Sequence, residues 1–392
     1  MKERIVIIGN GAAGNAALEE IISSKGDYDI TVITAEKTPP YYRPMLSEYI
    51  SVKEIPKRFY LHDHNWYKDN NIKILYGTEV TAIHTDAQTL SILDGDPIAY
   101  DKLLLCIGSH NFIPPIPGAE LEHVMDLRHL EDAEILKSKA WNSKKAVIIG
   151  GGLLGLELGW QLRKLNVEVS VIEMMDRLLP RQLDTEASQL FEKKVLETGI
   201  KVIKGVQTHE IYGTSAAEGV KISSGESIDA DFVVISIGIR AEVKLAQDGG
   251  LLTNRGILVN DFMQTNIKNI YAAGDCAEHQ GTNFAIWPEA VEQGKIAGLN
   301  MIDDKSVYTP VVPFNIYHGM NLRLFSIGDV GGNPANTYEV IRKGDDENFE
   351  KYFFLNDKIV GGVLMGNISK SSKLKKGVSE SMTKTDFEQL IG

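Results

Sequence analysis

The stretch Gly9-Asn10-Gly11-Ala12-Ala13-Gly14 lies between a short apolar run at 4–8 and a helix-forming run at 15–22. The chain repeats this pattern, in the same context, at Gly150-Gly151-Gly152-Leu153-Leu154-Gly155. One glycine of such a loop makes a tight turn, one lets backbone N–H groups approach a pyrophosphate, and one lets the helix pack on the strand. The repeat therefore predicts an α/β protein with two Rossmann-like units, each with a dinucleotide site.

Each unit also has a carboxylate at the end of its second predicted strand, about 20 residues after the glycines. These residues are Glu36 and Glu173. A single glycine motif is a weak signal. Two motifs, each followed by an acidic residue at the same spacing, are a strong signal, because chance would have to produce that spacing twice. Glu173 is expected to accept a hydrogen bond from a ribose 2′-OH and to repel a 2′-phosphate, which favours NADH over NADPH. Arg177, a few residues later, would soften that preference if it faced the nucleotide.

Composition excludes several classes of protein. The formal net charge of -12 argues against a nucleic-acid partner. No apolar run approaches the ~20 residues that span a bilayer, and the amino terminus runs directly into the first strand, so we expect a cytoplasmic protein without a membrane partner. Cys106 and Cys276 have no metal-ligand spacing, so we expect no metal site.

Several local signals divide the rest of the chain. The run Pro114–Gly118 is typical of a linker. A helix is predicted over 184–197, with Asp184 as its N-cap and Gly199 after its end. Another helix is predicted from about 288 to 301, with Pro288 in its first turn. Short alternating strands follow Tyr308, which predicts a small carboxy-terminal α+β domain.

The two glycine motifs and the late element Tyr271-Ala272-Ala273-Gly274-Asp275 resemble the FAD-dependent pyridine nucleotide:disulfide oxidoreductases, from residue 1 to about 305. The resemblance implies FAD on the first motif, NADH on the second, and Asp275 on the flavin ribityl chain. It also implies an FAD-binding domain at 1–112 and 238–305, an NADH-binding domain at 113–237 and the small domain at 306–392.

The resemblance assigns further residues to the cofactors. On their own, Arg128 is better explained as a solvated surface residue and Trp287 as core packing, but their order and spacing around the glycine motifs favour flavin contacts. The residues assigned to FAD are Gly9, Gly11, Ala13, Gly14, Glu36, Arg43, Pro44, Val80, Arg128, Asp275 and Trp287. Those assigned to NADH are Gly150, Gly152, Gly155 and Glu173.

Disulfide reductases of this superfamily have two redox cysteines after the first βαβ unit, and related peroxidases have one. This chain has Tyr41-Tyr42-Arg43-Pro44-Met45-Leu46-Ser47 there, which is similar to the element found in reductases of rubredoxin, ferredoxin and other small electron carriers. Cys106 is expected to be a small buried hydrophobe, and Cys276 to pack near FAD without chemistry. Electrons would then pass directly from flavin to an outside acceptor.

Two acidic residues are candidate catalytic groups. Glu157 resembles the family's Glu near the flavin and nicotinamide, although an acid favoured by the helix dipole is nearly as good an explanation. The carrier reductases commonly have Lys where this chain has Glu48. If Glu48 approached Glu157, the like charges would raise the pKa of one of them. Otherwise another cation would replace the Lys, or Glu48 would turn away.

We therefore expect an NADH-dependent reductase of a small acidic one-electron carrier, most like NADH:rubredoxin oxidoreductases. The alternatives are an NADH:ferredoxin-type or nitrite-reductase-associated reductase, and a non-catalytic NADH-sensing flavoprotein. The four lysines between Ser369 and Lys376 would steer an acidic carrier. Their simpler interpretation is a solvated, flexible loop.

Overall fold

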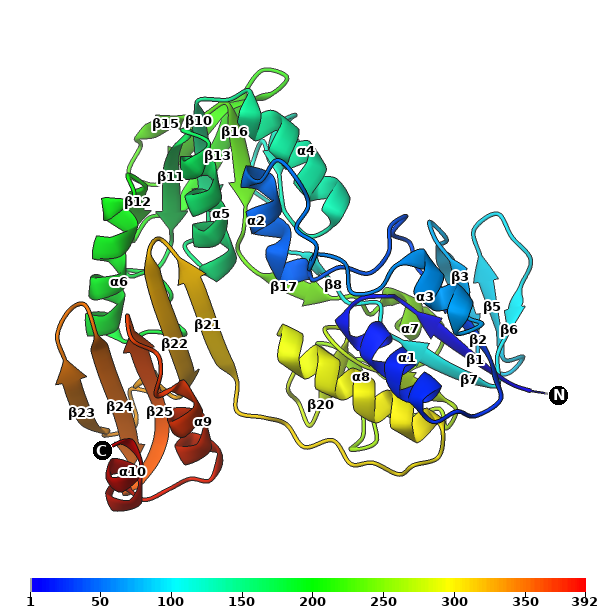
Figure 1. Cartoon of the computed structure of the whole chain (residues 1–392). Helices are drawn as coiled ribbons and strands as arrows, with labels where there is room; N and C mark the ends of the chain where they lie inside the picture. Colours follow the sequence, from blue (N-terminus) through cyan, green and yellow to red (C-terminus); the bar gives the residue numbers. More distant parts are fainter. Residues whose placement is uncertain (1) are drawn as a thin grey trace. The chain divides into compact units, whose positions relative to one another are not determined.

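The computed structural model describes residues 2–392, which form two compact units. The first unit contains the chain through Met45, Glu54–His110 and Ile239–Pro310. The second contains Leu46–Lys53, Asn111–Gly238 and Val311–Gly392. The chain therefore crosses between the units several times. Figure 1 shows the elements of each unit.

The first unit is built on a five-stranded parallel sheet with the order β19-β7-β1-β2-β3. Its strands are β1 (Glu3–Ile8), β2 (Tyr28–Ile33), β3 (Lys73–Leu75), β4 (Val80–His84), β5 (Thr89–Ile92), β6 (Ile98–Ala99), β7 (Lys102–Leu105), β8 (Ser109–Asn111, ending in the second unit), β17 (Ile239–Ala241), β18 (Ile257–Val259), β19 (Ile270–Ala272) and β20 (Ala277–His279). Its helices are α1 (Ala12–Ser23), the 3₁₀ turn η1 (Arg43–Met45), α3 (His64–Asp69), α7 (Lys244–Asp248) and α8 (Trp287–Met301).

Strand β1 alternates between the two faces of this sheet. Ile5 and Ile7 pack under α1 and α8, which lie side by side in Figure 1. Val6 and Ile8 face the opposite layer, which contains the antiparallel strands β4, β5 and β6. The apolar run at 4–8 is therefore buried on both faces, as expected for a central parallel strand.

Helices α1 and α8 touch backbone to backbone. A Cβ atom added at Gly294 would lie 2.2 Å from the carbonyl oxygen of Ala13, and one added at Gly298 would lie 2.6 Å from that of Ala17. Glycine at both positions on α8 is required for this approach.

The second unit contains a second five-stranded parallel sheet, in the order β12-β11-β10-β16-β9, and a five-stranded antiparallel sheet, in the order β21-β22-β25-β24-β23. Its strands are β9 (Val124–Met125), β10 (Lys145–Ile149), β11 (Glu168–Glu173), β12 (Lys201–Lys204), β13 (Thr208–Gly213), β14 (Ala217–Ile222), β15 (Ser227–Asp229), β16 (Phe232–Ile235), β21 (Phe314–Gly319), β22 (Leu322–Gly328), β23 (Glu339–Gly344), β24 (Phe349–Leu355) and β25 (Lys358–Met365). Its helices are α2 (Leu46–Ser51), α4 (Leu130–Trp141), α5 (Leu153–Lys164), α6 (Thr185–Glu197), α9 (Ser371–Ser379) and α10 (Lys384–Ile391).

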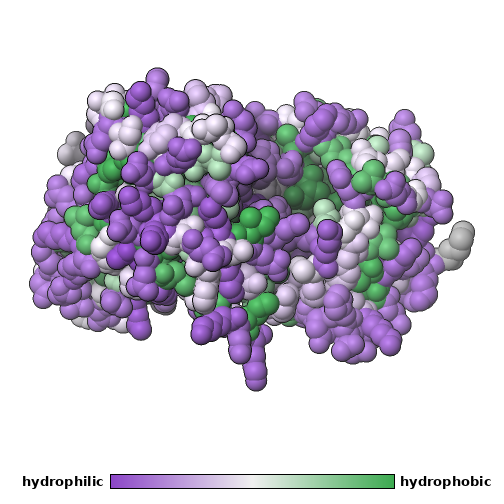
Figure 2. All heavy atoms as spheres, turned by 90° about the horizontal axis from the view of Figure 1, so that it is seen from above, coloured by the Kyte–Doolittle hydropathy of each residue, from purple (hydrophilic) through white to green (hydrophobic). Residues whose placement is uncertain are grey.

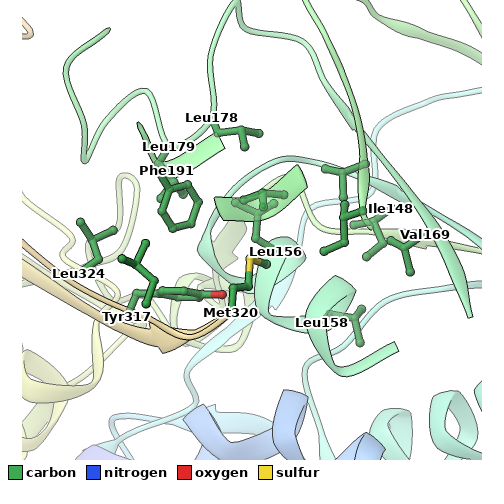
Figure 3. Packing of buried hydrophobic residues seen from close by; sticks show 14 of the residues in the cluster. Ile148, Leu156, Leu158, Val169, Leu178, Leu179, Phe191, Tyr317, Met320 and Leu324 are labelled. Atoms are coloured by element: carbon green, nitrogen blue, oxygen red, sulfur yellow. The ribbon is translucent and has the colours of Figure 1, made fainter. Parts of the chain in front are cut away.

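One face of the antiparallel sheet shares a hydrophobic core with α5 and α6. Figure 3 shows Tyr317 of β21 and Leu324 of β22 packed beside Phe191 of α6 and Leu156 of α5. The rings of Phe191 and Tyr317 meet edge to face, with centroids 5.6 Å apart. The other face of the sheet is covered by α9 and α10 through residues such as Phe387. The predicted combination of two Rossmann-like segments and a carboxy-terminal α+β segment is thus confirmed.

One local expectation was wrong, and another gains detail. The run Pro114–Gly118 has neither helix nor strand, but it packs onto β13, because Ile211 donates its N–H to the carbonyl of Pro117 at 2.8 Å and a Cβ on Gly118 would meet the Ile211 carbonyl. The lysine segment, in contrast, is not a flexible loop. It forms α9, because Leu374 and Val378, four residues apart, bury one face of the helix.

In the space-filling view of Figure 2, hydrophilic side chains cover most of the visible face, and hydrophobic atoms form small separate areas. Within residues 2–392, no helix combines the length and apolarity that crossing a membrane requires.

Candidate functional site

The first glycine loop forms an open cradle at the start of α1. Gly9 has a φ of +99°, and a Cβ there would lie 2.1 Å from the carbonyl oxygen of Cys106. A Cβ on Gly14 would lie 2.1 Å from the carbonyl oxygen of Gly9. At Gly11, in contrast, no atom of the described chain comes within 4 Å of an added Cβ. Gly9 and Gly14 thus let strand and helix touch, whereas Gly11 leaves space in front of the helix.

That space suits an anionic group. Gly11 is the N-cap of α1 and, as a glycine, has no side chain to cap this helix end. The first N–H groups of a helix have no partner within the helix and carry partial positive charge. A diphosphate is therefore a fitting occupant, in agreement with the FAD expected at this loop.

The second loop has the same construction. Gly150 has a φ of +116°, and its added Cβ would lie 2.1 Å from the carbonyl oxygen of Ser236. An added Cβ on Gly155 would lie 2.3 Å from the carbonyl oxygen of Gly150. Gly152 faces open space within the described chain and is the N-cap of α5, again without a side-chain cap. The residues present here fit the diphosphate of a second dinucleotide.

Around the first loop, the structure brings Glu36 and Arg43 together. The guanidinium of Arg43 pairs with one carboxylate oxygen of Glu36 at 2.7 Å, and the Tyr41 hydroxyl donates to the other at 2.5 Å. A carboxylate can accept several hydrogen bonds, and contact between Glu36 and the ribose of FAD stays a prediction. Pro44 follows in η1 and is exposed.

The late element returns to the same unit. Asp275 lies just after β19 and accepts a hydrogen bond from the Ser109 hydroxyl at 2.8 Å. Trp287 begins α8 and meets the ring of Tyr42 edge to face, with centroids 4.9 Å apart. Val80 begins β4 and is buried.

Ala13 and Arg128 are the remaining residues assigned to FAD. Ala13 packs against α8, as described above. Arg128 belongs to the second unit and lies just before α4. Its backbone N–H donates a hydrogen bond to the side-chain carboxylate of Asp132 in the first turn of that helix. Contact between Arg128 and FAD stays a prediction.

Glu173 is fixed at the second glycine loop. Its carboxylate accepts one hydrogen bond from the N–H of Gly151 and one from the N–H of Met175, both at 2.8 Å. The carboxylate therefore lies beside the cradle, where the sequence predicts a ribose contact. Arg177 pairs instead with Asp176 at 3.1 Å.

Glu157 lies in the first turns of α5 and has unusual proton affinity. Burial raises its pKa from 4.5 to about 7, and a hydrogen bond from the Ser47 hydroxyl of α2 partly opposes this. The sequence suggested that the like charge of Glu48 would raise this pKa, but burial is what raises it. The sequence also suggested that another cation would pair with Glu157, but the neutral hydroxyl of Ser47 is its hydrogen-bond partner. A carboxyl with a pKa near 7 can hold or release a proton at neutral pH.

Two neighbours of Glu157 were missed from the sequence. Ser47 belongs to the motif Tyr41–Ser47, and its position next to Glu48 is the sequence signal that places it near Glu157. Tyr317 is fully buried, and its hydroxyl has no hydrogen-bond partner in the described chain. Burial and the charge of Glu157 raise the pKa of the Tyr317 phenol. No local pattern marks Tyr317, because its proximity depends on how β21 packs.

Both thiols are buried in the first unit, as expected from their apolar surroundings. Burial raises the pKa of Cys276 to about 11 and raises the pKa of Cys106 as well. Since the thiolate is the reactive form of cysteine, neither is prepared for redox chemistry at neutral pH.

Comparisons with known proteins agree with this geometry. The family model for pyridine nucleotide-disulphide oxidoreductase matches residues 3–294, and that for the rubredoxin NAD+ reductase C-terminal domain matches residues 313–382. The nitrite reductase [NAD(P)H] of Bacillus subtilis is 37% identical over 95% of this chain, which spans only 47% of that relative. The chain thus covers about half the length of that protein.

A second relative matches end to end. The NADH-rubredoxin oxidoreductase of Clostridium acetobutylicum is 30% identical over 99% of this chain and 97% of its own length. The crystal structure of NADH:rubredoxin oxidoreductase from that organism superposes with a TM-score of 0.83 at 30% identity, covering 98% of this chain and 96% of the other. FAD and NADH are the cofactors of the matched family, and the two glycine loops fit them.

Proposed function

Because the chain belongs to the pyridine nucleotide-disulphide oxidoreductase family, and its relatives are NAD(P)H-dependent flavoprotein reductases, we propose that it passes electrons from NADH through FAD to a small one-electron carrier protein, with rubredoxin as the favoured carrier. The end-to-end match to the NADH-rubredoxin oxidoreductase of Clostridium acetobutylicum supports a carrier reductase.

The observation that carries the proposal concerns the thiols. The segment after the first βαβ unit, Tyr41–Ser47, has no cysteine. Cys106 and Cys276 are buried, and their raised pKa values keep them protonated. The chain therefore offers no ready thiol as a relay, which favours direct transfer to an external acceptor.

The chain's own residues bind and orient the cofactors. In the proposal, the open cradles at Gly11 and Gly152 hold the two diphosphates, and Glu173 selects NADH by accepting from its ribose. Glu157, whose pKa is raised to about 7 by burial, would hold or release a proton during the reaction. Bound FAD supplies the conversion between a two-electron hydride donor and a one-electron acceptor.

The carboxy-terminal segment supports rubredoxin as the carrier. Residues 313–382 match the rubredoxin NAD+ reductase C-terminal domain, and Lys373 and Lys376 are exposed on α9 in this segment. Carriers of this kind are acidic, so these lysines would speed their association.

A second candidate is a reductase module that supplies a nitrite-reducing partner. The 37% identity to part of the Bacillus subtilis nitrite reductase favours this candidate. The two candidates share the NADH and FAD steps and differ in the acceptor.

The test is reoxidation of the NADH-reduced, FAD-loaded protein in an anaerobic stopped-flow instrument. Oxidised rubredoxin should reoxidise the flavin rapidly, and ferredoxin should do so slowly. A variant with both cysteines replaced by Ala should react at the same rate once its FAD content and fold match the parent. If neither rubredoxin nor ferredoxin reoxidises the flavin and a long-lived NADH charge-transfer band forms, the result would instead indicate a sensor. Slower flavin reoxidation in the variant without cysteines would contradict direct transfer.

A further inference from the structure

A buried chain of polar side chains lies in the first unit, against the turn that follows β19. Its members are Glu289 and Gln293 of α8, and Tyr308, which comes after that helix. Each is at most 2% exposed, and none of them is among the residues assigned to FAD or NADH. Buried polar groups are costly unless they are hydrogen-bonded, so the contacts of these three side chains indicate what they hold in place.

The direction of each hydrogen bond in this chain is determined from one end. The backbone N–H of Gly274 can only donate, and it donates to Oε1 of Gln293 at 2.9 Å. The amide nitrogen of Gln293 must then face the other way, and it donates to the hydroxyl oxygen of Tyr308 at 3.3 Å. The single proton of that hydroxyl is left for Glu289, which accepts it. The Tyr308 hydroxyl is therefore the group that fixes the orientation of the Gln293 amide.

Tyr308 is itself held in place by its own contacts. Its backbone N–H donates to the carbonyl of Asp261 at 2.7 Å, and its ring meets that of His279 edge to face, with centroids 5.0 Å apart. Burial and the hydrogen bond to Glu289 raise the pKa of the Tyr308 phenol, so the hydroxyl stays protonated at neutral pH. Its position and its proton are thus both fixed.

The other end of the chain lies next to Asp275. Gly274 is buried with a φ of +82°, and a Cβ added there would lie 3.0 Å from the Cβ of Ala13 in the first glycine motif. On the far side of the turn, the side-chain amide of Asn283 donates to the carbonyl oxygen of Asp275 at 2.8 Å. Asp275 is therefore held between two side-chain amides, that of Gln293 before it and that of Asn283 after it.

We propose that Gln293 and Tyr308 are positioning residues for FAD, because they hold the N–H of Gly274 and, with it, the turn that presents Asp275 to the flavin. If the Gln293 amide turned round, its NH₂ group would face the Gly274 N–H, and this buried N–H would lose its acceptor. The turn would then shift until that N–H found another partner. The proposal rests on the proposed function through one contact, that of Asp275 with FAD, and does not depend on the electron carrier.

The test is the rate at which the purified holoprotein releases FAD, followed by the rise of flavin fluorescence after dilution into buffer without FAD. Tyr308→Phe keeps the ring and removes the hydroxyl, and it should release FAD about twofold to tenfold faster, the range expected for one lost hydrogen bond. Gln293→Met keeps the length of the side chain and removes both ends of the amide, and it should release FAD at least as fast as Tyr308→Phe. The visible circular dichroism of the bound flavin, which reports its contacts with the protein, should change in both variants.

A double variant separates positioning from a general loss of stability. If Tyr308 acts through Gln293, Tyr308→Phe should add nothing to FAD release in the Gln293→Met background, whereas independent structural effects would multiply. Tyr352→Phe is the matched control, because Tyr352 is also a buried tyrosine whose hydroxyl donates to a carboxylate, that of Glu350 at 2.7 Å, but in the second unit. This control should release FAD at the rate of the parent.

Asp275→Ala distinguishes the positioning role from the contact on which it rests, and it should release FAD faster than the parent. If it does so while Tyr308→Phe and Tyr352→Phe release FAD at the same rate, the positioning role is refuted. Effects that multiply in the double variant would refute it as well. Unchanged release from Asp275→Ala would remove the contact itself, and the positioning role with it. None of these measurements uses a carrier, so the stopped-flow test of the proposed function succeeds or fails independently.

Discussion

Replacing Glu157 by Gln should change how the stability of the protein depends on pH. Burial raises the pKa of this carboxyl from 4.5 to about 7. Between these two values the folded state binds the proton more tightly than the unfolded state does. The free energy of unfolding therefore falls as the pH rises through this window, and the full loss is present above pH 7. A glutamine keeps the hydrogen bond with Ser47 but has no proton to lose.

The size of the effect follows from the difference in proton affinity. Each tenfold change in affinity corresponds to about 1.4 kcal/mol, so a rise from 4.5 to about 7 corresponds to roughly 3 kcal/mol. Glu157 retains some solvent exposure, which screens part of this amount. We expect Glu157→Gln to gain about 1–3 kcal/mol over the parent at pH 8 and much less at pH 5.

Urea unfolding of the FAD-loaded protein at pH 5 and pH 8 measures this difference. The control is Glu226→Gln, because Glu226 is exposed between β14 and β15 and its replacement removes a carboxyl without removing a buried one. Equal gains for both variants, or no gain for Glu157→Gln at pH 8, would refute the reasoning that burial destabilises the charged form.

Three further predictions concern the cofactors and the carrier. Gly11→Val should fold but lose FAD, because its side chain would fill the open cradle, and flavin absorbance of the purified protein measures this; full FAD content would contradict the assignment. Glu173→Ala should shift the NADH-to-NADPH ratio of kcat/KM by about 1–3 kcal/mol, and an unchanged ratio would mean that this carboxylate does not face the ribose. Changing Lys373 and Lys376 to Glu should lower kcat/KM for rubredoxin more at low than at high ionic strength, with flavin reduction by NADH unchanged. A salt dependence equal to that of the parent would locate docking elsewhere.

Local signals in the sequence predicted the parts of the fold that local chemistry determines. Both glycine loops carry their requirement in their own residues, since the tight turn and the close packing of strand and helix need glycine wherever they occur. Asp184 caps α6 because its side chain accepts from Ala187, three residues away, as predicted. The turn between β24 and β25 is similarly local, because Asn356 and Asp357 adopt positive φ values of 51° and 65°.

Features that depend on tertiary packing could not be predicted in this way. The environment of Glu157 combines Ser47 and Tyr317, which come from distant segments, and no spacing rule links them. The proline-rich run was predicted as a linker because its composition suits one, yet contact with β13 decides its role. The sequence interpretation gave more weight to the lysines of α9 than to its apolar residues Leu374 and Val378. Burial of these two side chains on one face stabilises the segment as a helix.

The close contact between α1 and α8 also affects how the chain folds during synthesis. Helix α1 begins at Ala12, and the glycines on which it packs are in a helix that ends at Met301. At ~5–20 residues per second, the ribosome needs roughly 15–60 s to make the intervening chain. During that time the part of α1 that contacts α8, at Ala13 and Ala17, has no native partner, whereas the parallel sheet of the second unit is complete once β16 emerges. The first glycine loop is thus made early, but its supporting helix arrives among the later parts of the chain, and a nascent chain stalled before α8 would expose that part of α1 to chaperones or to other nascent chains.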